Sequence, residues 1–295
     1  MPIDLPLQLG EPAVHRGITI VPLFPRLSPT TAYLALDEAL EQGLVIAEIN
    51  EHGSVPELLV QNPLGHAVLL YDGEELVGAM QNRILNVSVL VGAGVDSRIP
   101  VSCVEQGRWS RRSRTFAAAP HAANPDLRRR KALRLEHDSL ALGAAQDEVW
   151  QAVGDQARRM SVHSPTGAAS DTFAARHNDL EELRGAFPLE PGQSGALLAL
   201  PGGGLCLDYV SRPEAYARLH QKLLQGYLLD GIESLDGVAV SGDRLTRFVR
   251  ELAGAKAIEQ PSIGLGDDLR LRVGETIGSG LLLDGELVQL SAYAA

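Results

Sequence analysis

The chain has 295 residues, of which 45% are hydrophobic and 21% are charged, and its formal net charge is -11. These values are ordinary for a globular protein and exclude global disorder, while the length suits one large domain or two modest ones. The acidic balance repels phosphate backbones, so nucleic acid is not an expected partner.

Two further features predict a soluble, cytoplasmic protein. Cys103 and Cys206 are the only cysteines, and each lies in an apolar, strand-like run, as expected of buried thiols in a reducing compartment. The N-terminus carries neither a charged leader nor a long apolar core, and no uncharged apolar run is long enough to cross a membrane. No membrane association is therefore expected.

The first part of the chain is rich in predicted strands. Apolar or alternating runs bounded by turn residues predict strands at 18–24, 44–49, 57–60, 66–71, 75–78, 83–91 and 99–105. The cap-type residues at 28–31 and the apolar spacing from Tyr33 to Leu40 predict a short helix that ends at Gly43. Asp72-Gly73 predicts a hairpin turn between the strands on either side of it.

Polar side chains occupy two of these strands at unusual density. In an extended segment Gln81 and Arg83 point to the same face, and on the strand at 99–105 Glu105 shares a face with Cys103. Burying such groups is costly unless each finds a partner. Arg83 and Glu105 are therefore predicted to meet, either in an internal polar network or at a ligand site.

The middle of the chain is predicted to hold helices and then a long loop. Asn124-Pro125-Asp126 is a helix start, and an apolar stripe from Val149 to Ala157 continues the helical pattern after a break at Gly143. The segment 161–195 is rich in Ser, Thr, Gly, Pro and Asp. It is predicted to be a long loop, a lid or a domain boundary.

The last part combines predicted hairpins and helices. A hairpin at 196–210 turns at Gly202-Gly203-Gly204, and the capping box at Ser211–Glu214 opens a helix whose stripe reaches Tyr227. A second helix is predicted at 243–253. Strands are predicted at 269–273, 281–283 and 287–290, with a turn at Asp284-Gly285.

Hairpins followed by helices, without a regular alternation of strand and crossover helix, predict an α+β fold. It should consist of antiparallel β-hairpins and sheet packed with several α-helices. We expect a single domain over 1–295 that divides into at most two subdomains, one strand-rich at about 1–120 and one of hairpin, helix and strand at about 196–295. A helical and loop-rich middle would join them.

Five segments of the chain together resemble one known family. They are Asp72-Gly73-Glu74-Glu75-Leu76, Gln81-Asn82-Arg83, Ile99–Trp109, Lys222–Tyr227 and Leu290–Tyr293. Over nearly its whole length the chain resembles the ARG and rhodanese-phosphatase-superfamily-associated protein domain family, whose name records an association with ADP-ribosylglycohydrolases and phosphatase-like proteins. The resemblance implies, by analogy, a context in nucleotide or ADP-ribose chemistry. Family members often carry a His where this chain has Gln289, which weakens an enzymatic interpretation that depends on that His.

The candidate site combines guanidinium groups, carboxylates and amides. Arg83 and Arg108 could form a clamp for phosphate or carboxylate, because each guanidinium offers two parallel donors. Glu105 is the candidate general base. The candidate ligand-binding residues are Glu75, Gln81, Asn82, Arg83, Asn86 and Arg108. The alternative is structural: Arg83 pairs with Glu105 or Arg108 with Glu75, and the amides satisfy irregular backbone.

Other residues receive simpler interpretations. Cys103 is taken as a small buried hydrophobe and Trp109 as a core anchor. The basic runs at 111–114 and 128–134 are taken as solvated faces of a loop and a helix. No metal site is predicted, because the carboxylates lack a tight ligand spacing. The cofactor and the oligomeric state are left unassigned.

Two functional hypotheses follow from this site. The leading one is a polar Arg/Glu/Asn cleft that binds or hydrolyses a nucleotide- or ADP-ribose-like phosphorylated small molecule. The alternative is a non-catalytic binding or scaffold protein in which the same residues form a structural ion-pair network. The hypotheses differ in whether the charged groups surround an opening or close against one another. The sequence does not decide whether the protein is an enzyme.

Overall fold

The computed structural model describes residues 5–51, 53–136 and 145–294. Within these residues it contains seven α-helices and 18 β-strands, arranged in sheets that are almost entirely antiparallel. This confirms the predicted α+β class. No helix among the described residues is long and apolar enough to span a membrane. The predicted break at Gly143 lies outside the described residues.

The larger sheet has nine strands, each antiparallel to its neighbours. Its strands in spatial order are β1 (Leu7–Leu9), β3 (Ile18–Pro25), β13 (Gly195–Ala199), β14 (Leu205–Val210), β18 (Glu286–Ala294), β17 (Thr276–Leu283), β16 (Asp267–Val273) and β15 (Ala257–Pro261), with β2 (Ala13–His15) beside β3. Helix α7 (Gly242–Ala253) packs Leu245, Phe248 and Leu252 into the core on this sheet. Strands from both ends of the chain thus share one sheet.

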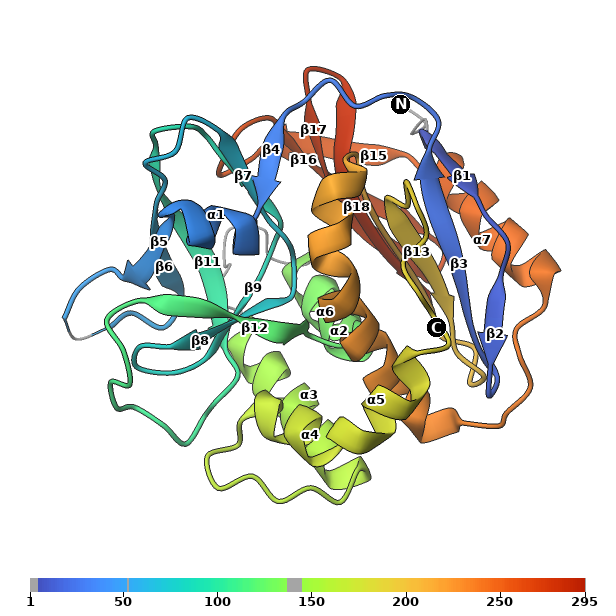
Figure 1. Ribbon diagram of the computed structural model, residues 1–295, viewed down its shortest axis with the longest axis horizontal. Helices are drawn as coiled ribbons and strands as arrows, with labels where there is room; N and C mark the ends of the chain where they lie inside the picture. The colour runs from blue at the N-terminus through green and yellow to red at the C-terminus, as the bar shows by residue number, and fades with distance from the viewer. Residues whose placement is uncertain (1–4, 52, 137–144, 295) are drawn as a thin grey trace.

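The remaining strands form two smaller sheets, on the left of Figure 1. One has the order β12 (Phe116–Ala122), β8 (Glu74–Gly78), β9 (Arg83–Leu85), β11 (Asp96–Cys103), β6 (Glu57–Gln61) and β5 (Val45–Glu48). The other has the order β10 (Val89–Val91), β7 (Ala67–Leu70) and β4 (Tyr33–Ala35), and its β4–β7 pair is parallel. Helix α1 (Leu36–Gln42) follows β4 directly.

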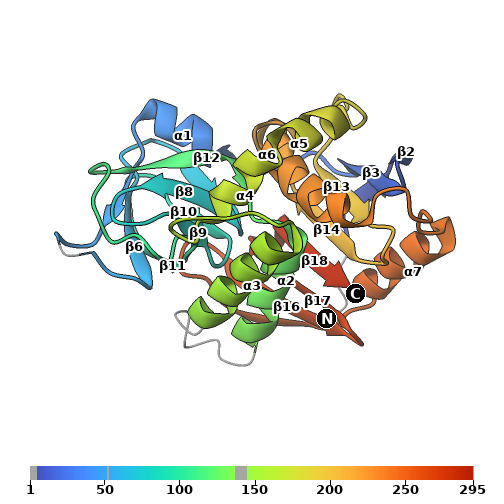
Figure 2. The ribbon, with the colours of Figure 1, turned by 90° about the horizontal axis from the view of Figure 1, so that it is seen from below.

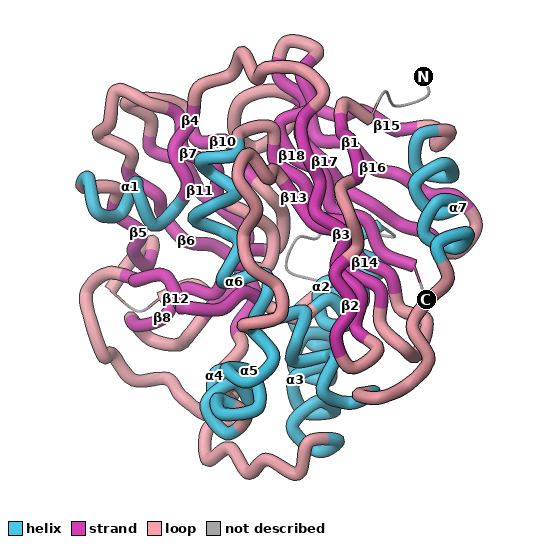
Figure 3. Tube along the Cα trace, turned by 45° about the vertical axis from the view of Figure 1, so that its right-hand side comes forward, coloured by secondary structure: helices cyan, strands magenta, loops and turns pink. Residues whose placement is uncertain are grey.

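Helix α6 (Pro213–Gly231) lies between the two groups of strands, as Figures 1 and 3 show. It contacts β4 and β12 on one side and β13 and β14 on the other, and it buries most of its length. The other helices are α2 (Pro125–Glu136), α3 (Gln146–Arg159), α4 (Ala169–Ala175) and α5 (His177–Arg184). Figure 2 shows α2 and α3 packed side by side, with α2 next to β17.

Several predicted elements are confirmed by the structure. β5 pairs with β6, β13 pairs with β14, and β16, β17 and β18 form consecutive hairpins. Helix α2 begins at Pro125, and α1 ends at Gly43, whose φ of 112° is the left-handed conformation that favours glycine. The first helix starts later than predicted, because Tyr33 lies in β4. The Tyr33 hydroxyl is hydrogen-bonded to the side chain of Ser211. Ser211 therefore does not cap α6, although the sequence predicted a capping box at 211–214.

The predicted hairpin across Asp72-Gly73 is wrong. β7 pairs with β4 and β10, whereas β8 pairs with β9 and β12, so the chain passes from one sheet to another at this turn. The carboxylate of Glu74 turns back to accept the backbone N–H of Tyr71 at 3.0 Å. This bond replaces a ladder bond that the hairpin would have used.

The predicted strand at 83–91 is two strands with a break at 86–88. β9 pairs with β11 and β10 pairs with β7, so the two halves belong to different sheets. Ser88 accepts the backbone N–H of Asp72 at 2.9 Å, and the backbone N–H of Asn86 bonds the carbonyl of Pro100. The alternation of faces that the sequence suggested therefore holds only as far as Leu85.

The segment 161–195 is not one long loop, because it contains helices α4 and α5. Phe173, Leu180 and Leu183 from these helices are buried in the core that surrounds α6. Their helical spacing is sparse and lies among many Ser, Asp and Gly residues, which suggested a loop. The proposed division into subdomains stays a prediction.

Candidate functional site

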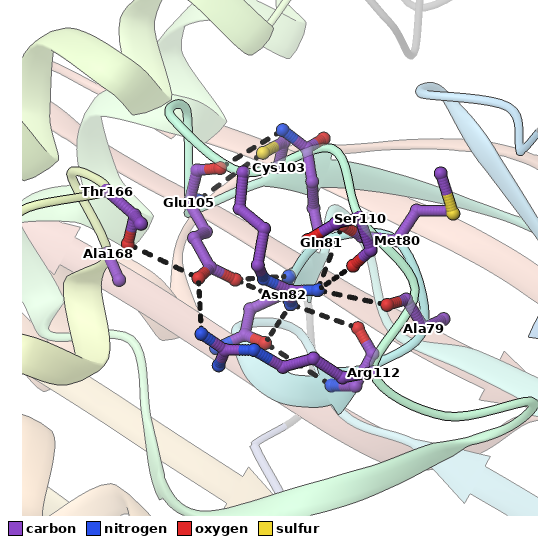
Figure 4. Close-up of polar contacts among 12 residues, drawn as sticks. Ala79, Met80, Gln81, Asn82, Cys103, Glu105, Ser110, Arg112, Thr166 and Ala168 are labelled. Atoms are coloured by element: carbon purple, nitrogen blue, oxygen red, sulfur yellow. Dashed lines mark hydrogen bonds and ion pairs between the residues drawn. The ribbon is translucent and has the colours of Figure 1, made fainter.

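The predicted site residues gather where the loop 79–82 meets the segment that follows β11 (Figure 4). Arg83 and Cys103 are direct partners in the β9–β11 pair, so the residues just before Arg83 face those just after Cys103. The backbone N–H of Val104 bonds the carbonyl of Asn82 at 3.1 Å and extends this pairing. We call Gln81, Asn82, Arg83, Glu105 and Arg108 the loop cluster.

Glu105 is the buried acceptor at the centre of the loop cluster. Its carboxylate lies 2.6 Å from Nη2 of Arg108 and accepts the backbone N–H of Asn82 at 3.2 Å. Thr166 donates a further hydrogen bond, and Arg112 approaches to 3.6 Å. Burial acts to raise the pKa of Glu105, but Arg108 and the Asn82 N–H outweigh it and lower that pKa. A carboxylate held ionised in this way is poorly suited to be a general base near neutral pH.

Arg108 occupies a cage of oxygen atoms. Its two terminal nitrogens donate to Asn82 Oδ1 and to the backbone carbonyls of Gly78, Ala79, Met80 and Ser110, at 2.8 to 3.1 Å. With the Glu105 carboxylate, the guanidinium thus ties together the two loops that meet at the cluster. Ala79, one of the cage residues, is buried at a φ of 37°, a conformation that this cage holds in place.

Arg83 is fully buried but less completely bonded. Nη1 donates to Gln81 at 2.8 Å, and Nη2 lies 3.9 Å from Glu48, while Nε and Nη2 have no hydrogen-bond partner among the described residues. The guanidinium lies 5.8 Å from the centre of the Trp109 ring. Burial lowers the pKa of Arg83 from its ordinary value.

Glu75 and Asn86 flank the cluster in different ways. Glu75 accepts a hydrogen bond from Asn82 at 3.1 Å and contacts His121 at 2.9 Å, and His121 stacks on Phe173. Asn86 lies beyond the far end of β9, at the break before β10. Neither predicted ion pair, Arg83 with Glu105 or Arg108 with Glu75, forms between these described residues, because Arg108 pairs with Glu105 instead. The cluster brings together five of the seven predicted residues, with Glu75 at its edge.

The exposed part of this region is the loop that follows Arg108. Trp109 is 49% exposed, so its prediction as a core anchor is wrong. Arg111, Arg112 and Arg114 are also exposed, as predicted for this basic run. The segment 164–168 covers the opposite side of the cluster, where the Gly107 N–H bonds the Thr166 carbonyl at 2.7 Å. We call 109–114 the Trp109 loop.

A second buried polar group was not predicted. Arg128 makes a two-point ion pair with Asp208, with N–O distances of 2.7 and 2.8 Å. Lys131, one turn further along α2, is hydrogen-bonded to Asp72 and to the carbonyl of Leu85. Both cations are buried, so the prediction that the run 128–134 is a solvated helix face is wrong for them. We call these four residues, with Tyr71, Tyr227 and Tyr293, the central network.

Aromatic hydroxyls complete the central network. Tyr71 and Tyr227 donate to Asp208 at 2.7 and 2.6 Å, and the Arg128 guanidinium lies 5.4 Å from the ring centres of both Tyr71 and Tyr293. Burial opposes ionisation of Asp208, but the Arg128 charge and these donors lower its pKa to about 2. The network joins α2, α6, β14 and β18 to the turn before β8.

In the sequence, only the segments that resemble the family pointed to residues of this network. Asp72, Tyr227 and Tyr293 lie in three of the matching segments and meet here, although up to 221 positions separate them. Lys222 and Glu74, from two of the same segments, form a neighbouring buried ion pair at 2.8 Å. Gln289, next to the last of the matching segments, donates to Ser291 at 2.8 Å.

Two pockets lie elsewhere in the molecule. One has a volume of about 460 Å³ and is bounded by α2, the β13–β14 hairpin and the end of α6. The other, of about 630 Å³, lies between the 27–30 segment and strands β15 to β18. No residue of the loop cluster lines either pocket. In the described part of the chain, no group of three or more His, Cys, Asp or Glu side chains could hold a metal ion.

Comparison with known proteins yields one family match. A family model described as "ARPP-1: ARG and Rhodanese-Phosphatase-superfamily-associated Protein domain" matches residues 6–293. Neither the curated proteins nor the solved structures contain a match.

Proposed function

The chain belongs to the ARG and rhodanese-phosphatase-superfamily-associated protein domain family, and from this premise we propose that it binds a nucleotide- or ADP-ribose-like phosphorylated small molecule on the Trp109 loop. The loop cluster supports this loop and does not itself contact the ligand. The two cysteines, both buried and unpaired, support a cytoplasmic location for this activity.

One observation carries the proposal: a half-exposed aromatic ring and three exposed arginines lie within six consecutive residues, 109–114, on a loop with a rigid base. The Trp109 ring can stack on a nucleobase, and stacking of this kind contributes about 1–3 kcal/mol per base. Guanidinium groups at 111, 112 and 114 can take the phosphates through paired hydrogen bonds. An acidic protein can still concentrate anions at such a local basic surface.

The buried residues beneath the loop give it a fixed shape. One terminal nitrogen of Arg108 donates to the carbonyls of both Met80 and Ser110. Arg108 and Ser110, the residues on either side of Trp109 in the chain, are therefore both fixed in position. Arg83 underlies the Trp109 ring. A loop that is already ordered loses less conformational entropy when a ligand binds. Gln81, Asn82, Arg83, Glu105 and Arg108 thus serve binding indirectly.

Fluorescence of Trp109 tests the proposal. Trp109 and Trp150 are the only tryptophans, so Trp150→Phe leaves Trp109 as the single reporter. We expect ADP-ribose and AMP to quench its emission and to raise the melting temperature, whereas ribose should do neither. Trp109→Leu and the triple change of Arg111, Arg112 and Arg114 to Gln should each weaken binding about tenfold or more.

A matched control comes from the same sheet. Arg98 on β11 is exposed and pairs only loosely with Glu57, at 3.9 Å, so Arg98→Gln should leave binding unchanged. Absence of quenching and of any thermal shift at about 5 mM ADP-ribose and AMP would reject the proposal. An equal loss of affinity in Arg98→Gln would show that binding follows general charge and not the loop.

A second candidate function is a scaffold that binds no small molecule. The six oxygens around Arg108 favour it, because they occupy the terminal nitrogens of the guanidinium with partners from the protein itself. Under this alternative, Glu105→Gln lowers stability and no nucleotide restores it. Under the leading proposal, saturating ADP-ribose recovers part of the lost stability by mass action.

A further inference from the structure

The pocket of about 460 Å³ has a floor of apolar side chains and a charged rim. Leu198, Leu205 and Tyr293 line the floor, and residues of α2, α3 and the turn after α6 line the rim. Figure 2 shows α2 beside the end of β18, where this pocket lies. The Gly202–Gly204 turn forms its outer edge, and Arg244 from α7 holds that turn through the Gly203 carbonyl at 2.6 Å. The pocket is therefore bounded by several fixed elements.

Arg129 is an uncommitted cation in this rim. Four consecutive basic residues run from 128 to 131, and three of them are bonded to carboxylates: Arg128 to Asp208, Arg130 to Glu148 and Asp155, and Lys131 to Asp72. Arg129 makes no ion pair with any described residue, and its buried Nε has no hydrogen-bond partner. A partly buried guanidinium without a partner costs stability. Such a group is a candidate for binding an anion from solution.

Three carboxylates share the rim with Arg129. Asp230 is buried and fixed by the backbone N–H of Asp126 at 2.9 Å and by the side chain of Asn124 at 2.5 Å. Glu233 is neutralised by a two-point pair with Arg159, at 2.6 and 3.1 Å. Arg159 also lies 3.7 Å from Asp126, so its charge is shared between Asp126 and Glu233. The side-chain oxygens of Asp126 and Asp230 keep lone pairs beyond these contacts and can accept hydrogen bonds from hydroxyl groups.

We propose that this pocket binds a small sugar or polyol that carries one phosphate group, with the phosphate on Arg129 and the hydroxyls on Asp126 and Asp230. The apolar floor suits the nonpolar face of a sugar ring, and the volume falls in the range of small-molecule sites. The surrounding carboxylates would repel a ligand with several phosphates. The pocket is separate from the Trp109 loop, and this proposal does not depend on the function assigned to that loop.

Calorimetry on the full chain tests the proposal, with ribose 5-phosphate as the probe and ribose and inorganic phosphate as comparison ligands. We expect ribose 5-phosphate to bind with a Kd below about 1 mM and each comparison ligand to bind at least about tenfold more weakly. Arg129→Gln should weaken ribose 5-phosphate binding about tenfold or more. Its melting temperature without ligand should be unchanged or higher, since an unpaired charge is removed.

Arg134→Gln is the matched control, because Arg134 lies on the same helix, is exposed and does not line the pocket. It should bind ribose 5-phosphate like the unaltered chain. Trp109→Leu should also bind it normally, so a failure at the loop and a failure at the pocket are distinguishable. Absence of heat at about 10 mM ribose 5-phosphate would overturn the proposal. So would unaltered affinity in Arg129→Gln, or equal affinity for inorganic phosphate.

Discussion

The loop cluster and the central network are both buried and both contain paired guanidinium and carboxylate groups, yet they differ in what surrounds them. Arg108 is bonded mainly to backbone carbonyls of nearby loops, and exposed residues begin immediately after it. Arg128 is bonded to Asp208 and enclosed by two tyrosine rings. The first arrangement shapes a loop, whereas the second joins distant parts of the chain.

This difference has an energetic consequence. Water can reach the edge of the loop cluster, where Arg112 is mostly exposed and lies 3.6 Å from Glu105, so a lost charge there can be partly replaced. In the central network both Arg128 and Asp208 are inaccessible to solvent. Removal of one partner there would leave a buried charge without compensation, which is more costly than the pair itself is stabilising.

Arg128→Met should produce the largest effect among the variants that test this comparison. It leaves Asp208 buried with only hydroxyl and thiol donors, so we expect the free energy of unfolding to fall by about 3–5 kcal/mol. Denaturant titration followed by circular dichroism measures it. Arg130→Met is the matched control: Arg130 is partly exposed in its pairs with Glu148 and Asp155, so the loss should be about 1 kcal/mol or less. Equal losses in the two variants would contradict the distinct role of the central network.

Arg108→Met should produce a smaller effect, about 2–3 kcal/mol, because several carbonyls and Glu105 lose their donor but the region is open to water at one edge. Arg112→Ala alone should cost no more than about 0.5 kcal/mol, since that side chain is exposed. The double variant should lose more than the sum of the two, because Arg112 can no longer approach Glu105. Additive losses would show that Arg112 provides no such compensation.

The contrast between the two regions also explains what the sequence could predict. The alternation of faces on the two strands was enough to place Gln81 and Arg83 near Glu105, but it predicted an Arg83–Glu105 pair where the structure has Arg108 with Glu105. Asp208 and Arg128 are 80 positions apart, on a strand and a helix whose contact depends on the whole fold. No periodicity in either segment carries that information.

The same reasoning accounts for the misassigned elements. The runs at 66–78 and 83–91 had strand-like composition, and strands were found there, but their partners depend on side-chain bonds from Glu74 and Ser88 to the backbone of the 71–72 turn. Trp109 was expected in the core because tryptophan is usually buried there. Its exposure follows from the tethering of its neighbours by Arg108, a contact that composition does not reveal.

A further expected effect concerns two buried aspartates and the pH dependence of stability. Asp208 faces Arg128, whereas Asp230 has no cation bonded to it within the described part of the chain and accepts hydrogen bonds from Asn124, Gln156 and the Asp126 N–H. Burial, the largest influence, raises the pKa of Asp230 to about 7, and the nearby charges of Asp126 and Glu233 add to it. Because this folded-state pKa exceeds the unfolded value, the contribution of Asp230 to stability is full at low pH and is lost as the pH rises toward 7. We expect a loss of about 2 kcal/mol between pH 5 and pH 8, measured by denaturant titration at each pH, and a flatter profile in Asp230→Asn.

Asp208 has the opposite sign, since its lowered pKa makes its contribution to stability disappear only below about pH 4. A profile for Asp230→Asn that still falls as steeply above pH 5 would assign the dependence to another group.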